Sequence, residues 1–304
     1  MSLNSVNTNI GAQVALASLN STNTQLQATQ KRVSTGYRVA DATDDGGAYA
    51  IAQRVRTDVG ALTTVNEQLG NAKALVGTAL TALTSISGSL TTAKDLLVKI
   101  GNVANTQDQR NQYVATYKSL VSQVANFVDG SNYNGQSLLG KVAGATVTAG
   151  TDTSVINSES GSTSKITNAD SSGLANTLAT LIGSTFSRSA AGVDSFGTIT
   201  AGNDQSAAST ALTATSGTTA FSTALLGVSN QLNQTGADSN LLDTTVTFNS
   251  SKIDSLNAGL GALIDTDLSK ESAKLQALQI KQQLGTQALS LANQAPQSLL
   301  SLFK

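Results

Sequence analysis

The sequence contains no cysteine, no histidine and no tryptophan, and it has a single proline. Without cysteine the chain has neither a disulfide scaffold nor a thiolate nucleophile. Without histidine it lacks the common general base, the Ser-His-Asp triad and most zinc coordination. It also has no phosphate-binding loop motif. We therefore expect no catalytic, cofactor-binding or metal-binding residues, and we expect that the protein is not an enzyme.

Charged residues make up 12% of the chain, aromatic residues make up 4%, and the formal net charge is -1. Such dispersed and balanced charge argues against nucleic-acid binding. No apolar run reaches the roughly 18 residues that a membrane helix needs, so we expect no membrane span. The N-terminal segment lacks the basic and apolar regions of a cleavable secretory signal. With few bulky side chains, the core must come from Leu, Val and Ala along helices that share a seam.

The stretch from Leu62 to Ile100 has the strongest pattern in the chain. Its apolar residues recur at alternating steps of three and four, which is the repeat of a left-handed coiled coil. A helix of this length runs roughly 60 Å, so it cannot fold around a globular core and needs partners along its side. The apolar positions are Leu62, Val65, Leu69, Ala72, Val76, Ala79, Leu83, Ile86, Leu90, Ala93, Leu97 and Ile100.

Four other segments show helical periodicity. The first covers residues 12–33 and is expected to stop at Gly36. Asp44 or Asp45 then caps the long helix. A third helix carries the face from Tyr113 to Phe127 and forms a hairpin with the long helix. In residues 225–263 apolar residues again recur at alternating steps of three and four. We therefore expect this segment to pack against Leu62–Ile100.

The last segment, residues 265–295, carries two apolar stripes. Pairing with residues 12–33 satisfies one stripe, so the other implies contact with other copies of the chain. One stripe consists of Ala277, Ile280, Leu284, Ala288, Leu291 and Ala295, and the other of Leu275, Leu278, Leu289 and Ala292. The facing positions of the first segment are Ala12, Leu16, Leu19, Asn23, Leu26, Gln30 and Val33.

Residues 141–224 are rich in Ala, Gly, Ser and Thr, and the helical periodicity fades there. Ala145–Ala149 and Phe196–Ala201 are predicted to be strands. The expected fold is mainly α, a long out-and-back helical hairpin or coiled-coil rod. A small β-rich or irregular outer domain is inserted in its middle.

Five segments resemble those of bacterial flagellins. Val6–Asn9 is similar to the start of that family, and KRVSTGYR (Lys31–Arg38) resembles its RLSSGLR segment. Asp44–Arg54 resembles the segment with Asp-Asp followed by AIA and Arg. Tyr133–Leu139 is similar to its FNG turn, with Tyr133 in place of Phe, and Gln279–Lys304 resembles its C-terminal tail, which contains ANQ and PQ. The order and terminal placement of these segments favour a flagellin, of a pattern that resembles alphaproteobacterial members.

The resemblance implies a structural subunit that self-polymerises into the flagellar filament outside the cell. Residues 1–40 and 265–304 would form an inner coiled coil around a channel. Residues 41–140 and 225–264 would form a helical rod, and residues 141–224 would project outward. The partners implied are other flagellin copies, including sister flagellins, the filament cap, hook-junction proteins and a cytoplasmic export chaperone. Export would proceed unfolded through the flagellar type III apparatus.

These assignments name three sets of residues. Subunit packing is assigned to Leu16, Leu19, Leu26, Val33, Leu275, Leu278, Ile280, Leu284, Leu289 and Leu291. The rod core is assigned to Leu62, Leu69, Val76, Leu83, Ile86, Leu90, Leu97, Ile100, Leu256 and Leu260. The channel lining is assigned to Gln276, Gln283 and Gln287, from a Gln-rich face that an ordinary solvated surface also explains.

Several alternatives remain beside the filament subunit. A hook–filament junction protein shares related termini, although the C-terminal tail favours the filament protein. A soluble coiled-coil receptor fragment does not explain the Gly/Ser/Thr-rich middle. Flagellins that alert the host Toll-like receptor carry QRVREL on the long helix, where Thr92 here replaces the first Arg. A planar bidentate donor is then missing, so the resemblance implies weak innate immune receptor recognition.

Overall fold

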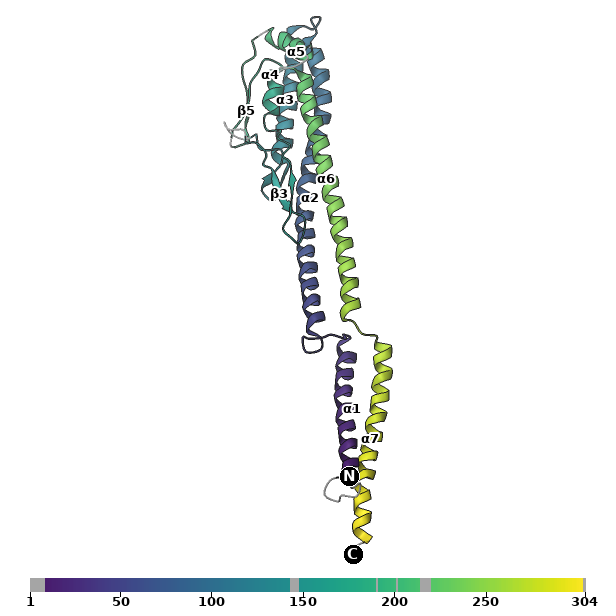
Figure 1. Cartoon of the computed structure of the whole chain (residues 1–304). Helices are drawn as coiled ribbons and strands as arrows, with labels where there is room; N and C mark the ends of the chain where they lie inside the picture. Colours follow the sequence, from purple (N-terminus) through teal and green to yellow (C-terminus); the bar gives the residue numbers. More distant parts are fainter. Residues whose placement is uncertain (1–8, 143–147, 190, 201, 214–219, 303–304) are drawn as a thin grey trace. The chain divides into compact units, whose positions relative to one another are not determined.

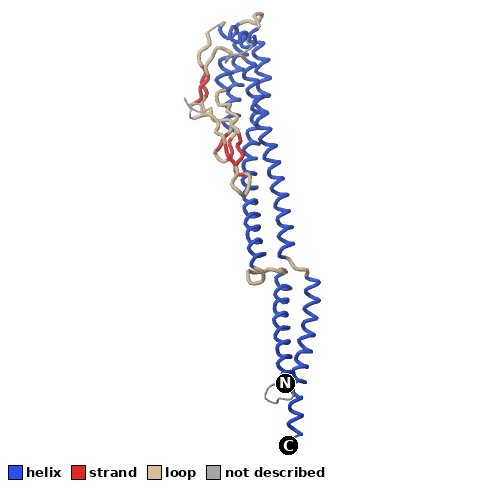
Figure 2. Tube along the Cα trace, in the orientation of Figure 1, coloured by secondary structure: helices blue, strands red, loops and turns tan. Residues whose placement is uncertain are grey.

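The structure, a computed structural model, describes residues 9–142, 148–189, 191–200, 202–213 and 220–302, with side chains as far as Gln294. Helices dominate it, and three two-stranded antiparallel hairpins lie in the middle of the chain (Figures 1 and 2). The mainly helical fold class is confirmed. The helices are α1 (Ile10–Thr35), α2 (Gly46–Gly101), α3 (Gln107–Gly130), α4 (Leu174–Thr180), α5 (Asn203–Thr213), α6 (Phe221–Ile264) and α7 (Leu268–Leu302). The strands are β1 (Asn132–Tyr133), β2 (Gln136–Ser137), β3 (Thr153–Ile156), β4 (Thr163–Ile166), β5 (Phe186–Arg188) and β6 (Asp194–Phe196).

The described chain divides into two compact units. Residues 1–60 and 253–304 form one, here called the terminal unit, and residues 61–252 form the other, the central unit. The three-part division expected from the sequence stays a prediction.

The apolar stripe of α2 is the core of the central unit. Every stripe position from Leu62 to Ile100 is buried. From Val65 onward, the stripe shares one hydrophobic cluster with residues of α3 and α6, such as Val121 and Val228. Burial of a Leu-sized side chain contributes about 1.5–3 kcal/mol. This shared seam explains how a chain with few aromatic residues builds a core.

Helix α3 starts with a capping box. The Thr106 side chain accepts the backbone N–H of Gln109, and Gln109 Oε1 accepts the N–H of Thr106. The two residues thereby satisfy donors that the helix end leaves free. Farther along, the Tyr117 hydroxyl is buried and donates to the Leu178 carbonyl at 3.0 Å. This bond joins α3 to α4, and burial raises the pKa of Tyr117.

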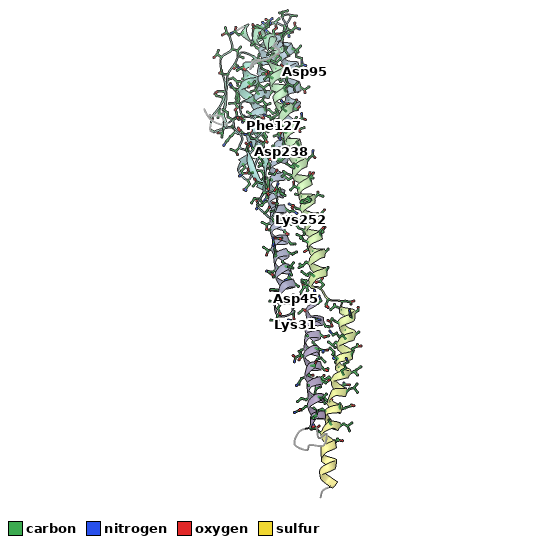
Figure 3. All side chains as sticks on the ribbon, viewed as in Figure 1. Lys31, Asp45, Asp95, Phe127, Asp238 and Lys252 are labelled. Atoms are coloured by element: carbon green, nitrogen blue, oxygen red, sulfur yellow. The ribbon has the colours of Figure 1, made fainter. Side chains whose placement is uncertain are left out.

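Polar residues of α6 bind the β3–β4 hairpin and the residue that follows it. The Thr167 N–H donates to buried Asp238 at 3.1 Å, and Asn249 Nδ2 donates to the Asn157 carbonyl at 3.1 Å. Lys252 forms an ion pair with Glu159 of the same hairpin. Asp238 and Lys252 can be followed along α6 in Figure 3. Asn249, a break in the ladder, is therefore an attachment point for the middle of the chain, together with Asp238 and Lys252.

The predicted strand Phe196–Ala201 was wrong in position. Phe196 is the last residue of β6, and residues 197–200 form no strand. The strand predicted for Ala145–Ala149 stays a prediction, because its first three residues lie outside the described part, as does Ala201. Helices α4 and α5 were not expected, because seven and eleven residues rich in Ala, Ser and Thr show little periodicity. Leu178 and Ala208 join the α2 cluster, so a separate inserted domain is less distinct than expected.

The terminal unit has a small cluster of its own. The rod-core assignment grouped Leu256 and Leu260 with the α2 stripe, but both are half-buried. Leu260 packs instead in the terminal unit, because α6 meets the start of α2 and the preceding turn there. The buried members of this cluster are Val39, Ala48, Ala52 and Ile264.

Within the described residues, α2 is the one helix long and apolar enough to cross a membrane by length and composition. The window that passes this test has a mean hydropathy of 1.3, and 44% of it is buried inside the chain. Core helices pass the same test, so this is weak evidence for a membrane span.

Candidate assembly site

Helices α1 and α7 pair within the terminal unit. Asn9 caps α1, because its Oδ1 accepts the N–H of Ala12 at 3.0 Å. At the other end Gly36 has a φ of 74°, a left-handed conformation that favours glycine, and its N–H donates to the Arg32 carbonyl. The predicted stop at Gly36 is confirmed. Asp267 Oδ1 accepts the N–H of Ser269 and of Lys270, and so caps α7.

Polar contacts link the two helices at three levels. Asn9 Nδ2 donates to the Ala292 carbonyl at 2.7 Å, and Gln282 Nε2 donates to Asn23 Oδ1 at 2.8 Å. The Arg32 guanidinium pairs with Glu271, which is buried, at 3.1 Å. A residue late in α1 contacts a residue early in α7, and the residue that caps the start of α1 contacts a residue late in α7. The two helices are therefore antiparallel. Polar contacts in an apolar seam fix the register of a coiled coil.

The side chains between α1 and α7 are only partly buried from solvent. Leu278 is buried, whereas Leu275 and Leu289 of α7 and Leu19, Leu26 and Val33 of α1 are half-buried. Gly285 gives room for Leu19, because a Cβ at Gly285 would lie 3.2 Å from Leu19 Cδ1. Leu16 is 48% exposed and Gln30 is exposed, so both lie outside the seam in which the sequence placed them.

Helix α7 has a seam with α1 and an outward side that carries both apolar side chains and glutamines. Leu278, Gln282 and Gly285 lie on the seam with α1. An apolar flank lies about 130–170° around the helix from the seam, since successive residues are about 100° apart. Its large side chains are exposed: Ile280 58%, Leu284 58% and Leu291 70%. The exposed glutamines Gln276, Gln283 and Gln287 lie beside this flank, also away from the seam, and Gln287 is about 20° around the helix from Ile280.

The outward side of α1 is apolar too. Ile10 is 50% exposed and Val14 is 64% exposed, and both lie away from the seam formed by Leu19 and Leu26. An apolar flank on α7 and a second apolar patch on the paired helix are more than scattered surface side chains. Contiguous exposed apolar surface marks an interaction site. What this arrangement can do is associate with other apolar surfaces.

The turn between α1 and α2 is held by charge. Lys31 Nζ contacts Asp41 Oδ2 at 2.6 Å and Asp44 Oδ2 at 2.9 Å. Hydrogen bonding to Lys31 holds the pKa of both carboxyl groups below its ordinary value. Asp45 is the residue that caps α2, since its Oδ1 accepts the Ala48 N–H at 3.0 Å. Lys31 and Asp45 mark this turn in Figure 3.

A buried arginine anchors the β5–β6 hairpin to α3 in the central unit. Arg188 is 5% exposed, and its guanidinium contacts Asp194 at 2.5 and 2.9 Å and Asp129 at 2.9 Å. It also donates to the Ser122 carbonyl at 3.2 Å. The hydrogen bonds from Arg188 lower the pKa of Asp194. The sequence analysis missed this residue, because an Arg-Asp spacing of six residues in a Ser-rich stretch has no distinctive pattern.

The described residues contain no group of three or more Asp or Glu side chains that could hold a metal ion.

Comparison with known proteins shows the family to which this chain belongs. Residues 6–143 match the bacterial flagellin N-terminal helical region, and residues 218–303 match the bacterial flagellin C-terminal helical region. The chain belongs to the bacterial flagellin family. The two matched regions contain α1, α7 and the α2 stripe, so the family resemblance lies in the paired terminal helices and the core.

Known flagellins align with this flagellin along its whole length. Flagellin FljK of Caulobacter vibrioides is 35% identical over 307 residues, with 100% of each chain covered. A flagellin of Brucella melitensis is 35% identical over 309 residues, with 99% of each chain covered. Flagellin C of Rhizobium meliloti is 32% identical, with 99% of this chain and 100% of that one covered. The protein is therefore a structural subunit of the flagellar filament, and these three relatives come from alphaproteobacteria.

A solved structure of Bacillus cereus flagellin is also similar, with a TM-score of 0.45 and 22% identity. It covers 60% of this chain and 88% of that one.

Proposed function

We propose that this flagellin polymerises through its terminal unit, with the apolar flank of α7 packed against neighbouring copies. The observation that carries the proposal is the exposure of Ile280, Leu284 and Leu291 on a helix whose other apolar face already contacts α1. Burying each such side chain is worth about 1.5–3 kcal/mol. The half-buried side chains between α1 and α7 contribute less than this to the stability of a single chain. Packing against other copies in the polymer would therefore add stability that one chain lacks.

The predicted domains give the proposed filament its layers. Residues 1–40 with 265–304 would form the inner layer, residues 41–140 with 225–264 the helical layer around it, and residues 141–224 the outer surface. Export through the flagellar type III apparatus, a chaperone on the C-terminal helix, and growth under a cap next to hook-junction proteins complete the proposal. Sister flagellins would co-assemble through the same flank. Weak recognition by the innate receptor follows from Thr92, which is exposed on α2 where activating flagellins carry Arg.

Electron microscopy of the purified chain separates this proposal from a hook–filament junction protein. A filament subunit polymerises by itself into long filaments. A junction protein is needed in few copies and would form none. Short oligomers without filaments would favour the junction protein.

The terminal helices are expected to become protected from proteases on assembly. Ordering each residue costs about 1–2 kcal/mol, which a seam with mostly half-buried side chains barely offsets. Limited proteolysis should therefore cut the monomer within α1 and α7 at least about tenfold faster than the filament. Cleavage in the loop between α2 and α3 serves as the internal control. Equal protection of both termini in monomer and filament would contradict the proposal.

The Gln face of α7 is proposed to line the central channel. It is polar and carries no formal charge, so it would neither bind apolar segments of a passing chain nor trap its charged groups. Replacing Gln283 and Gln287 together by Asp should shorten the filaments about twofold or more in cells, because negative charge lines the whole channel. Thr286→Asp is the single-charge control, because Thr286 is exposed and lies about 60–100° around the helix from Gln283 and Gln287. Filaments of unchanged length in the double variant would count against this role.

A further inference from the structure

The central unit has a groove on one edge, beside α2. Its walls are α2 between Gln68 and Leu75, the β1–β2 turn at Tyr133, and strand β3. The groove has a volume of about 710 Å³, and every described residue that lines it is uncharged. Leu75 is buried at its α2 wall, while Tyr133 is 36% exposed and Ile156 is 47% exposed. An apolar side chain could enter such a groove without meeting an unpaired charge.

The opposite edge of the central unit carries an apolar stripe on α6, here called the α6 stripe. Leu226 is 62% exposed, Leu241 is 49% exposed and Phe248 is 63% exposed. These three residues lie within about 60° of one another around the helix. A Phe with most of its surface in water, aligned with two exposed leucines, is costly unless another molecule covers it.

Contacts between α2 and α6 show that the groove and the stripe face in opposite directions. On α6, Asp243 pairs with Lys73 at 2.5 Å, and Leu241 lies two residues before Asp243. Two residues turn a helix by about 200°, so Leu241 points away from α2. Phe248 stands in the same relation to Ser250, which accepts a hydrogen bond from Asn66 at 3.4 Å.

The same relation holds on α2. Asn71 lies two residues before Lys73, and Gln68 lies two residues after Asn66, so both groove residues point away from α6. A groove on one edge and a stripe on the other cannot meet within one chain. Complementary patches on different faces of a subunit produce head-to-tail contacts, which build open-ended polymers.

We propose that the α6 stripe of one copy fills the α2 groove of a second copy. The spacing supports this pairing: Leu241 and Phe248 lie seven residues apart on α6, about 10.5 Å along the axis. The α2 wall from Gln68 to Leu75 has the same length. The described residues that line the groove and the three residues of the α6 stripe are uncharged, and Lys252, one turn from Phe248, is paired with Glu159. The inference rests on the proposed polymerisation and adds a lateral contact made by the central unit.

A cysteine pair tests this contact, because the chain has no cysteine of its own. Asn71→Cys combined with Phe248→Cys should give a ladder of covalent multimers when filaments are oxidised mildly. A disulfide requires Cα atoms within about 7 Å, and the two positions lie on opposite edges of one chain. Each single variant should stop at the dimer. Asn71→Cys with Thr247→Cys is the matched control, since Thr247 is exposed on the same helix about 100° from Phe248.

The outcomes are distinguishable. A ladder at least about tenfold stronger with Phe248→Cys than with Thr247→Cys supports the contact. Filaments without a ladder, or equal ladders in both pairs, overturn the contact and leave the proposed function standing. Failure of the unmodified chain to form filaments overturns both. Loss of filaments with Phe248→Cys but not with Thr247→Cys also supports the contact.

A charge exchange gives a second, independent measurement. Phe248→Asp and Asn71→Lys should each raise the critical concentration for polymerisation about tenfold or more, because a charge enters an uncharged contact. The double variant brings opposite charges together between copies and should recover to within about threefold of the parent. Additive losses in the double variant would overturn the pairing. Circular dichroism of each monomer confirms that both exposed positions tolerate the changes.

Discussion

Leu284→Asp is expected to abolish filament formation while leaving the monomer as stable as the parent chain. Leu284 is 58% exposed on the apolar flank of α7, so the substitution removes little that the single chain uses. In the proposed filament the flank is covered by another copy. An aspartate there loses about 1.5–3 kcal/mol of apolar burial and adds the cost of a buried unpaired charge. The critical concentration should therefore rise by at least about 100-fold.

Sedimentation of the polymer measures this effect, and thermal unfolding of the monomer checks that the fold is intact. Thr286→Asp is the matched control, because Thr286 is exposed on the same helix but lies on the other side of the seam. It should change the critical concentration by less than about threefold. If Leu284→Asp filaments formed at the parent concentration, the α7 flank would not be a subunit contact.

Arg188→Ala is expected to destabilise the central unit by about 3 kcal/mol. The guanidinium is 5% exposed and supplies the hydrogen bonds that join Asp194 and Asp129. Removing one partner of a buried ion pair costs about 3–5 kcal/mol. The lower end applies here, because both carboxylates keep some solvent exposure. Urea unfolding should show the loss as a lower midpoint with an unchanged slope.

The pH dependence of this variant follows from the lowered pKa of Asp194. A carboxyl group with a lowered pKa in the folded state stabilises the fold above its ordinary pKa near 3.8. That contribution is lost as the pH falls through the lowered value. The stability difference between the parent and Arg188→Ala should therefore be full at pH 7 and shrink below about pH 4. Lys165→Ala removes an ion pair with a largely exposed lysine and should leave the urea midpoint close to that of the parent at either pH.

The long helices could be predicted from the sequence because their patterns are local. The α2 stripe repeats over many turns, and each of its positions is buried. The stop at Gly36 needed only a glycine in a left-handed conformation. The two stripes of α7 already implied two partners, and the structure places Leu275, Leu278 and Leu289 toward α1 and leaves Ile280, Leu284 and Leu291 exposed.

The middle of the chain could not be predicted in the same way. Its short helices and hairpins gain their stability from contacts with distant residues, such as Tyr117 with Leu178 and Asp238 with Thr167. No pattern among consecutive residues predicts a contact between residues so far apart in the sequence. The role of Arg188 was hidden for the same reason, because one of its two carboxylate partners lies on another element.

The sequence by itself determined the helical class, the extent of the apolar stripes and the membership in the flagellin family, because periodicity and terminal motifs are properties of consecutive residues. Only the tertiary structure decided which stripe of α7 is covered by α1, where the middle of the chain is attached, and that α2 and α6 expose a groove and a stripe on opposite edges. Those depend on which distant side chains meet, since burial and hydrogen bonding are settled by packing and not by order along the chain.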